Sequence, residues 1–351
     1  MKRIASILIL ICLCMSLCAC AGTASEPAAQ PETTGEVQAA PEATPESEPE
    51  PTVDSDLPVN IMALNGTTGF GMAKLISDTQ NGEAALNYTI SVESDASAVT
   101  AALISGDCDI AALPTNAAAT VYNKTEGGVQ MLAINTLGVL YLVVNSETAT
   151  VKSLEDLSGM TVYAPAQNPT FLFKAILSAA GLEDVTVDNT YAQPADLRTA
   201  LAAGEVDIAV LPEPMVTIAR SANESLVTAL DLTAEWDKVQ PKGSLVQGCV
   251  VARTDFAAEH PTEIAAFLEE YEASIAHLNE DAASAGALIE ETGVFTNGAV
   301  AAKAIPNCNV CFITGAEMQA ALSEFLTIMH GVAPASVGGS IPGDDFYCIL
   351  N

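Results

Sequence analysis

Positive charge is scarce in this chain of 351 residues, which has 12 Lys and Arg against 44 Asp and Glu and a formal net charge of −32. Such an excess of acid repels nucleic acid and anionic lipid surfaces at long range. We therefore exclude nucleic acid as a partner. We interpret the charge as a solubilising acidic surface rather than as an acidic binding patch.

Residues that carry common catalytic chemistry are also scarce. The chain has three histidines: His260, His277 and His330. None is paired with a Ser or Cys in a recognisable nucleophile motif. The glycines of residues 66–71 do not follow the order of a dinucleotide-binding fingerprint, and no phosphate-loop Lys-Ser/Thr follows them. Nothing in the sequence demands an enzyme, and nothing indicates a cofactor.

Nine cysteines are present, but four of them lie within residues 12–20. The other five are Cys108, Cys249, Cys308, Cys311 and Cys348. This odd count argues against a complete disulfide framework. Cys308 and Cys311 have the spacing of a redox or metal pair, but no second pair or nearby His completes a zinc site. We expect buried thiols or a local disulfide here, and no metal.

The first residues contain a long hydrophobic run. Lys2 and Arg3 precede the uncharged stretch 4–19, which has the organisation of an export signal. The stretch is short for a membrane span, which needs about 20 apolar residues. Leu17-Cys18-Ala19-Cys20 resembles a bacterial lipoprotein box, which predicts a signal peptide at 1–19 and lipidation, with palmitate, at Cys20. Cleavage before Cys18 is the alternative, but it would put the bulky Leu17 at the cut.

A spacer follows the lipoprotein box. Residues 22–56 contain no Lys or Arg and are rich in Pro, Glu, Ala and Thr. Such a stretch buries too little apolar surface to offset chain entropy. We expect 20–56 to be a lipidated cysteine with a disordered acidic linker, anchored at the outer face of the cytoplasmic membrane. The folded body keeps 35 acidic and 10 basic residues, a net charge of −25.

Two segments about a hundred residues apart repeat each other. Residues 101–114 read AALISGDCDIAALP, and residues 199–212 read TALAAGEVDIAVLP. Each is typical of the end of a helix, a Gly that stops it, and a short buried strand that ends at Pro. Two copies predict two similar lobes. Open α/β lobes direct their strand ends to a shared crevice, where small ligands bind.

The remaining elements fit two lobes of alternating strands and helices. Strands are expected at 59–64, 88–92, 160–164 and 185–190, and helices at 71–80 and 171–181. The apolar runs 137–144 and 245–252 are the expected crossover strands, and helices at 262–279, 281–292 and 315–330 return to the first lobe. We therefore divide the body into lobe 1 (57–140 and 248–351) and lobe 2 (141–247).

Polar residues gather where these strands would reach the crevice. The candidate ligand-binding residues are Asn65, Thr67, Thr68, Gly69, Phe70, Thr115, Asn116, Gly138, Gln167, Asn168, Thr170, Glu213 and Gln247. Helix starts offer free N–H groups to a ligand, although simple Ser/Thr capping is the alternative. Phe70 either stacks on a ring or belongs to the core, and Glu213 either accepts ligand donors or caps a helix.

Arginine is missing from all of these segments. The body contains Arg198, Arg220 and Arg253, and none of them lies on a segment that reaches the crevice. Tightly held anions often use a bidentate Arg. The sequence therefore favours a neutral or cationic solute.

The order of the motifs resembles a known family. The motifs are the lipoprotein box, GTTGFGMAKL at 66–75, the two Asp-Ile-Ala strands, Glu213-Pro214, and Arg253-Thr-Asp-Phe with His260-Pro261, Phe267-Leu268 and Tyr271. Together they resemble the nitrate/sulfonate/taurine-type solute-binding proteins of ABC importers, including those that bind thiamine-pyrimidine precursors. The resemblance covers most of 57–330.

The resemblance implies a periplasmic-binding-protein type II fold. Each lobe would be a mixed, mostly parallel sheet flanked by helices, with two crossover strands between the lobes. The implied function is capture of a small molecule and its delivery to an ABC permease with its ATPase, by a monomer without catalytic residues. A ligand-sensing surface lipoprotein is one alternative. An enzyme of the pyrimidine-precursor or menaquinone-pathway type is another, but those enzymes are intracellular, and the lipoprotein box argues against them.

Overall fold

The computed structural model of the protein describes residues 52–349. The expected signal peptide, Cys20 and most of the expected linker lie outside the described residues. The end of that linker, 52–56, lies inside them, and the backbone N–H of Asp54 donates to Glu263 of the body at 2.8 Å. Within the described part of the chain, no helix has both the length and the hydrophobicity to cross a bilayer.

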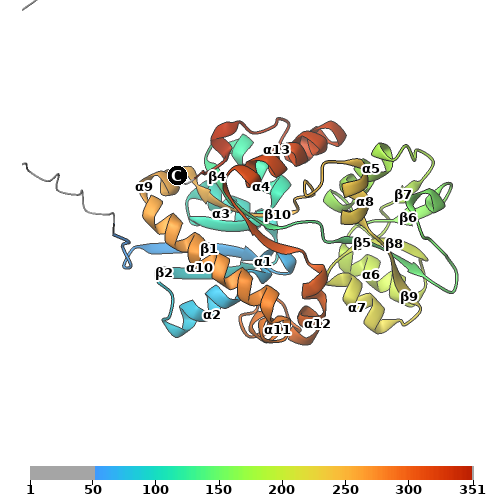
Figure 1. Ribbon diagram of the computed structural model, residues 1–351, viewed down its shortest axis with the longest axis horizontal. Coiled ribbons are helices and arrows are strands. Elements are labelled where there is room, and N and C mark those ends of the chain that lie inside the picture. Colours follow the sequence, from blue (N-terminus) through green and yellow to red (C-terminus); the bar gives the residue numbers. More distant parts are fainter. Residues whose placement is uncertain (1–51, 350–351) are drawn as a thin grey trace, which may run out of the picture. The chain divides into compact units, whose positions relative to one another are not determined.

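Lobe 1 is built on a six-stranded sheet in the order β11-β4-β10-β3-β1-β2. Its strands are β1 (Pro58–Leu64), β2 (Asn87–Glu93), β3 (Ile110–Pro114), β4 (Val129–Thr136), β10 (Gly248–Arg253) and β11 (Val310–Ile313). Figure 1 shows this sheet on the left, with the long helix α10 across it. The chain therefore leaves lobe 1 after β4 and returns to it at β10.

Lobe 2 contains a five-stranded sheet in the order β7-β6-β8-β5-β9. Its strands are β5 (Leu140–Asn145), β6 (Thr161–Tyr163), β7 (Thr186–Asp188), β8 (Ile208–Pro212) and β9 (Leu226–Asp231). Every strand of this sheet comes from between β4 and β10, so the second sheet is an insertion into the first.

Both sheets are mixed, as predicted, but neither is mostly parallel, because parallel pairs are two of five in lobe 1 and two of four in lobe 2. Parallel pairs join β1 to β2 and β3 in lobe 1, and β6 to β7 and β8 in lobe 2. The crossover strands β10 and β5 run antiparallel to β3 and β8. Further antiparallel pairs join β4 to β10 and β11, and β5 to β9. In each lobe the parallel pairing is confined to three strands, β2-β1-β3 in lobe 1 and β7-β6-β8 in lobe 2.

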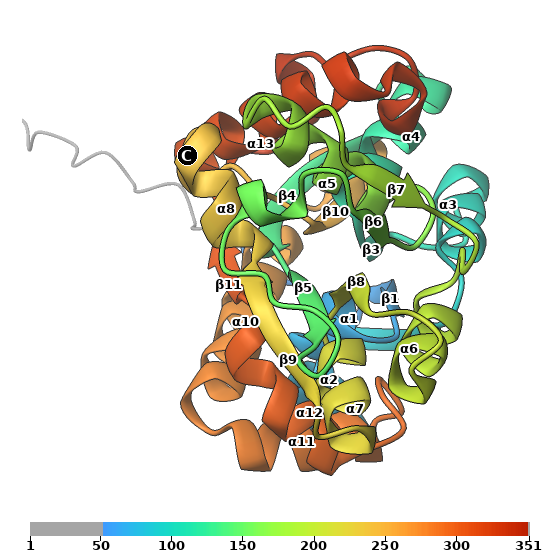
Figure 2. The ribbon, with the colours of Figure 1, turned by 90° about the vertical axis from the view of Figure 1, so that its right-hand side faces the viewer.

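Helices cover the sheets on both faces (Figures 1 and 2). In lobe 1 and its C-terminal extension they are α1 (Thr67–Phe70), α2 (Ala73–Asn81), α3 (Ala96–Ser105), α4 (Thr115–Thr125), α9 (Thr254–Glu259), α10 (Pro261–Glu280), α11 (Ala282–Glu291), α12 (Gly298–Ala304) and α13 (Gly315–Val332). In lobe 2 they are α5 (Asn168–Ala179), α6 (Pro194–Ala203), α7 (Met215–Ala222) and α8 (Leu232–Val239). Short 3₁₀ turns occur at η1 (Leu154–Leu157), η2 (Ile305–Asn307), η3 (Pro334–Val337) and η4 (Asp344–Phe346).

The repeated sequence folds as the same unit in both lobes, α3–β3 and α6–β8. Gly106 and Gly204 end the two helices with φ angles of 83° and 74°, the left-handed conformation that glycine adopts without strain. Each strand then ends at its Pro, opposite the first residue of a crossover strand. Pro114 pairs with Gly248, and Pro212 pairs with Leu140. The two prolines therefore mark the edge of each sheet that faces the other lobe.

One apolar cluster continues from lobe 1 into lobe 2 through α13. Phe325 on α13 is fully buried, and its ring centroid lies 6.2 Å from that of Trp236 on α8. The same cluster contains Phe173 of α5. In Figures 1 and 2, α13 lies beside α5 and α8. We call this contact the α13 seam, and it joins the lobes in addition to the crossover strands.

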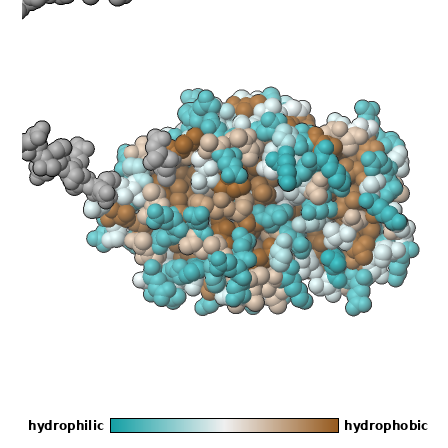
Figure 3. All heavy atoms as spheres, viewed as in Figure 1, coloured by the Kyte–Doolittle hydropathy of each residue, from teal (hydrophilic) through white to brown (hydrophobic). Residues whose placement is uncertain are grey.

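The face shown in Figure 3 is covered by hydrophilic side chains that interrupt the hydrophobic ones. This distribution agrees with the interpretation of the acidic composition as a solubilising surface.

Candidate functional site

The hinge between the lobes is organised the same way on both sides. In lobe 1 the residue after the Pro of the repeat, Thr115, donates its N–H to Gln247 O at 3.2 Å. In lobe 2 the equivalent residue, Glu213, donates its N–H to Val139 O at 3.0 Å. The Val139 N–H in turn donates to Gln247 Oε1 at 2.7 Å. Four residues from four segments are thus tied together at the base of the crevice.

Gly138 is packed too tightly for any other residue. A Cβ at this position would lie 2.6 Å from Leu245 Cδ2, well inside van der Waals contact. Its carbonyl accepts a hydrogen bond from Asn309 Nδ2 at 2.5 Å. In the sequence, the segment 308–311 was notable only for its two cysteines. The structure instead gives Asn309, between them, a contact with the hinge.

Glu213 combines a structural role with a position between the lobes. Its side chain is 3% exposed, and its carboxylate accepts bonds from Thr217 N and Thr217 Oγ1, both at 3.0 Å. These bonds cap the start of α7, which was the alternative role for this residue. Asn307 Nδ2, from lobe 1, lies 3.5 Å from Glu213 Oε1. Burial raises the pKa of the Glu213 carboxyl, and the Thr217 bonds oppose this shift.

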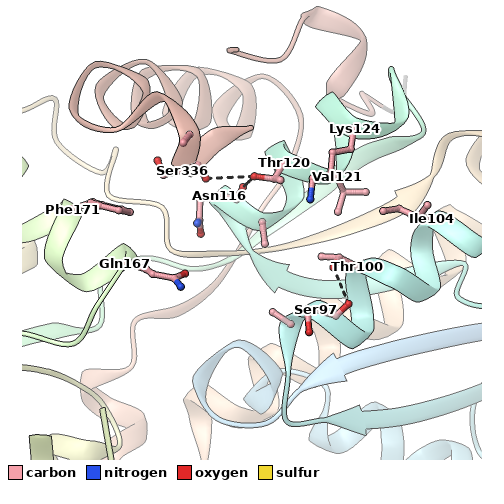
Figure 4. Close-up of a pocket in the computed structure, with 13 residues that line it drawn as sticks. Ser97, Thr100, Ile104, Asn116, Thr120, Val121, Lys124, Gln167, Phe171 and Ser336 are labelled. Carbon is pink, nitrogen blue, oxygen red and sulfur yellow. Dashed lines mark hydrogen bonds between the residues drawn. The ribbon is translucent and has the colours of Figure 1, made fainter. Parts of the chain in front are cut away.

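A cavity of about 420 Å³ opens between the two lobes. Figure 4 shows it bounded by α3 and α4 on one side and by the start of α5 on the other. Lobe 1 contributes Ala96, Ser97, Thr100, Ile104, Asn116, Ala117, Thr120, Val121, Lys124, Ala335 and Ser336, and lobe 2 contributes Gln167 and Phe171. Two of the predicted residues, Asn116 and Gln167, therefore line one cavity from opposite lobes.

Several buried polar atoms near the starts of α4 and α5 have no hydrogen-bond partner within the described residues. They are Thr115 Oγ1, Asn116 Oδ1 and Asn168 Oδ1. An unpaired buried polar atom costs about 1–3 kcal/mol, so most such atoms in folded proteins are paired. All three atoms belong to predicted site residues. Of the three residues, Asn116 lines the cavity between the lobes, whereas Thr115 and Asn168 lie behind its lining.

Gln167 is held in an unusual backbone conformation. Its φ and ψ angles are 64° and −123°, and it immediately precedes α5. Residues other than Gly rarely adopt positive φ, at a cost of about 1–3 kcal/mol, and such residues cluster at functional sites. The side chain is exposed and points into the cavity (Figure 4). The strain thus holds a polar side chain where it faces lobe 1.

Other predicted residues are packed into their own lobe. Phe70 is 1% exposed, and its ring lies 6.1 Å from that of Phe295, so it is a core residue, as in the alternative interpretation. Gly69 is buried against the Leu64 carbonyl. The Thr170 hydroxyl donates to Pro165 O at 2.7 Å. These three are held by protein groups and are not free to contact a solute in this structure.

The predicted loop at 65–70 forms the single-turn helix α1 and does not lead directly into α2. Its N-cap is Gly66, and no side chain caps it, so the Ser/Thr cap of the alternative interpretation does not form. Asn65 is exposed, while Thr67 and Thr68 are half-buried. None of these residues lines the cavity between α4 and α5.

Three residues in or near the site, Asn135, Phe171 and Ser336, were not predicted. Asn135 is 1% exposed and donates through Nδ2 to Thr68 O at 3.1 Å and to the Tyr271 hydroxyl at 3.0 Å, which ties α1 to β4. Its signal was a polar Asn-Thr pair that ends an apolar strand. Phe171 and Ser336 carried no such signal, because only tertiary packing brings them to the cavity.

The described cysteines are free thiols. Cys108, Cys249 and Cys308 are buried, whereas Cys311 and Cys348 are half-buried. Burial raises the pKa of each thiol, to about 12 for Cys311, which favours the unreactive protonated form. Within the described residues, no three His, Cys, Asp or Glu side chains are grouped to hold a metal ion.

Two α/β lobes that are joined by crossover strands and share one cavity define a two-lobed fold, which can be assigned to a family. A model of the family described as NMT1/THI5 like matches residues 82–285, more than half of the chain. The chain belongs to this NMT1/THI5-like family. No curated protein matches the chain.

Solved structures share the fold. An ABC transporter protein from Parabacteroides distasonis is 24% identical, with a TM-score of 0.72 over 85% of this chain and 100% of its own. The periplasmic aliphatic sulphonate binding protein SsuA from Escherichia coli is 16% identical, with a TM-score of 0.65 over 84% and 94%. A ligand-binding component of an ABC-type import system from Staphylococcus aureus is 14% identical, with a TM-score of 0.60 over 83% and 96%. The predicted periplasmic-binding-protein fold is thereby confirmed.

Proposed function

We propose that this protein is an extracytoplasmic solute-binding protein that captures a small molecule between its two lobes. In this proposal Cys20 carries the lipid that anchors it to the membrane, and the loaded protein delivers its solute to an ABC permease with its ATPase. Membership of the NMT1/THI5-like family supports the proposal. So does the shared fold of SsuA, a sulphonate-binding protein, and of the import component from S. aureus.

The observation that carries the proposal is the cavity between α4 and α5. Its volume of about 420 Å³ lies within the usual range for small-molecule sites, roughly 300–1,000 Å³. Asn116 of lobe 1 and Gln167 of lobe 2 face it from opposite sides (Figure 4). A molecule bound there would bridge the lobes, so lobe closure and solute binding would favour each other.

The lining favours a neutral solute over a cationic one. Hydroxyl and amide side chains and small apolar residues make up most of it, with Lys124 as its basic residue. No carboxylate occurs among the described residues that line the cavity. The ring of Phe171 faces the cavity from lobe 2 and would pack against a planar solute, the role that Phe70 cannot fill.

Native mass spectrometry of the gently purified protein tests the proposal. We expect a bound mass that disappears on denaturation and identifies the solute. Calorimetry with that solute should then show weaker binding by Asn116→Ala and Gln167→Ala. The loss should be roughly 2- to 12-fold each, for a hydrogen bond of about 0.5–1.5 kcal/mol. Asn87→Ala, at an exposed position on β2, is the matched control. Equal affinity in all four proteins would contradict this site.

The anchor and the delivery step need tests of their own. Cys20→Ser should abolish incorporation of labelled palmitate and release the protein from the membrane fraction. The solute-loaded protein should stimulate the ATPase of its reconstituted importer more than the empty protein does. Stimulation that is equal with and without solute would contradict delivery.

A further inference from the structure

The last part of the chain forms a strap across lobe 1. We define the strap as residues 333–348, which follow α13 and lie beyond the family match at 82–285. Two of its residues, Ala335 and Ser336, line the cavity described above. Figure 4 shows Ser336 beside Asn116, with Phe171 of lobe 2 facing them. The strap is therefore part of the wall of the candidate solute site.

Hydrogen bonds from α4 hold the strap in place. Asn123 Nδ2 donates to Val337 O at 2.8 Å and to Ser340 O at 2.7 Å. The Ser340 hydroxyl donates back to Asn123 Oδ1 at 3.0 Å. A single asparagine side chain thus fixes both ends of a four-residue turn. Because Asn123 is two turns along the helix from Asn116, the strap and the site share one rigid element.

Close packing reinforces these bonds. Val337 is fully buried in the main apolar cluster. Gly338 has a φ angle of 81°, and a Cβ there would lie 3.0 Å from the backbone of Thr120 on α4. A side chain at position 338 would therefore press against α4, so the strap and α4 are closely packed here. A wall packed in this way cannot recede to admit a larger molecule.

The far end of the strap is also fixed. The Phe346 ring is fully buried and lies 4.9 Å from the Tyr122 ring, and the Tyr122 hydroxyl donates to Asp345 Oδ1 at 2.5 Å. Cys348 N–H donates to Met131 O of β4 at 2.9 Å. Anchors on both sides of residues 335 and 336 make this segment a fixed surface.

We propose that the strap sets the size limit of the solute and that Ser336 is the position that determines it. This proposal rests on the proposed function of the same cavity. The Ser336 hydroxyl already donates to Ala333 O at 2.7 Å, so the small volume of the side chain matters more than its polarity. Ala335 beside it is small as well. Together they leave open a space that a larger side chain would fill.

The test uses the purified full chain and a low-molecular-mass aqueous extract of the producing cells as the probe. Native mass spectrometry measures which masses each variant binds. Ser336→Trp should lose at least tenfold of the occupancy seen for the parent, because the indole fills the cavity. Ser336→Ala should keep it. Thr327→Trp, on the exposed side of α13, is the matched bulky control and should also keep it.

The outcomes separate the two proposals. If the parent binds no mass from the extract, the proposed function fails and this inference fails with it. If the parent binds a mass and folded Ser336→Trp binds it equally well, the strap does not limit solute size. Should Ser336→Trp fail to fold, Ser336→Leu takes its place, with a smaller loss of occupancy expected. Loss of occupancy in Ser336→Ala would also overturn the inference, because it would show that the hydroxyl itself is needed.

Discussion

Gln167 combines a strained backbone conformation with a side chain that lines the cavity. The backbone before α5 has a φ angle of 64°, which glycine would adopt freely. The chain has glutamine there, and its side chain reaches the cavity between the lobes. A strained residue persists when the surrounding structure holds it and when its side chain is needed.

Replacing Gln167 should therefore separate stability from binding. Gln167→Gly relieves strain of about 1–3 kcal/mol but loses about 0.5–1 kcal/mol to the entropy of glycine. Gln167→Ala loses the same side chain and keeps the strain, so it is the matched control. We expect Gln167→Gly to be about 1 kcal/mol more stable than Gln167→Ala in chemical denaturation, and both to bind solute more weakly than the parent. If Gln167→Gly is less stable than Gln167→Ala, the result would contradict strain in the backbone.

Glu213 should make stability depend on pH. Burial raises the pKa of this carboxyl in the folded state above its ordinary value of 4.5. Between pH 4.5 and the raised pKa of the folded state, the folded protein holds a proton that the unfolded chain has lost. The stability that Glu213 contributes is therefore complete below pH 4.5 and is lost as pH rises through the raised pKa.

Denaturation of the parent and of Glu213→Gln across this pH range measures the effect. The variant has no carboxyl to titrate at this position. We expect the stability of the parent, relative to the variant, to fall as pH rises above 4.5. A difference that stays constant with pH, or one that grows, would contradict a raised pKa.

At the scale of elements, the repeated units were predictable because their signals are local. Glycine stops α3 and α6, proline ends β3 and β8, and an apolar run lies between them. Each signal acts within a few residues, so the local structure it favours does not depend on distant parts of the chain. The crossover strands were predictable for the same reason, as apolar runs on either side of the inserted lobe.

Other parts of the site depend on contacts that local patterns do not encode. Phe70 faces Phe295 of a distant segment, and the sequence could not decide between core and ligand for it. The strap has no periodic pattern, and its position comes from Asn123 and Phe346. The α13 seam was also missed, because an amphipathic helix does not reveal which lobe its apolar face covers.

The α13 seam carries a prediction about stability. Phe325→Ala should destabilise the protein by about 3–5 kcal/mol, the usual cost of truncating a fully buried phenylalanine. Trp236, the one tryptophan of the chain, lies against Phe325 and is fully buried. In Phe325→Ala the fluorescence emission of Trp236 should therefore shift to longer wavelength, because water enters the space that the Phe325 ring filled. Thr327→Ala on the exposed side of α13 should change neither property. An unchanged spectrum and stability in Phe325→Ala would show that α13 does not bridge the lobes.

For the whole molecule, the central feature is the meeting of two similar lobes at one cavity. The hinge joins Thr115 and Glu213, equivalent residues of the two repeats, through Gln247 and Val139. The cavity lies between α4 of lobe 1, which begins at Thr115, and α5 of lobe 2, which begins at Asn168. Binding and closure would then be one event, because a bound solute contacts both lobes.

Amide hydrogen exchange, measured with and without the small-molecule extract of the producing cells, tests whether solute is held between the lobes. We expect solute to slow exchange at the start of α4, residues 115–121, and at the start of α5, residues 168–172, in the same titration. Slower exchange in only one lobe, or at neither helix when a bound mass is present, would contradict capture between the lobes.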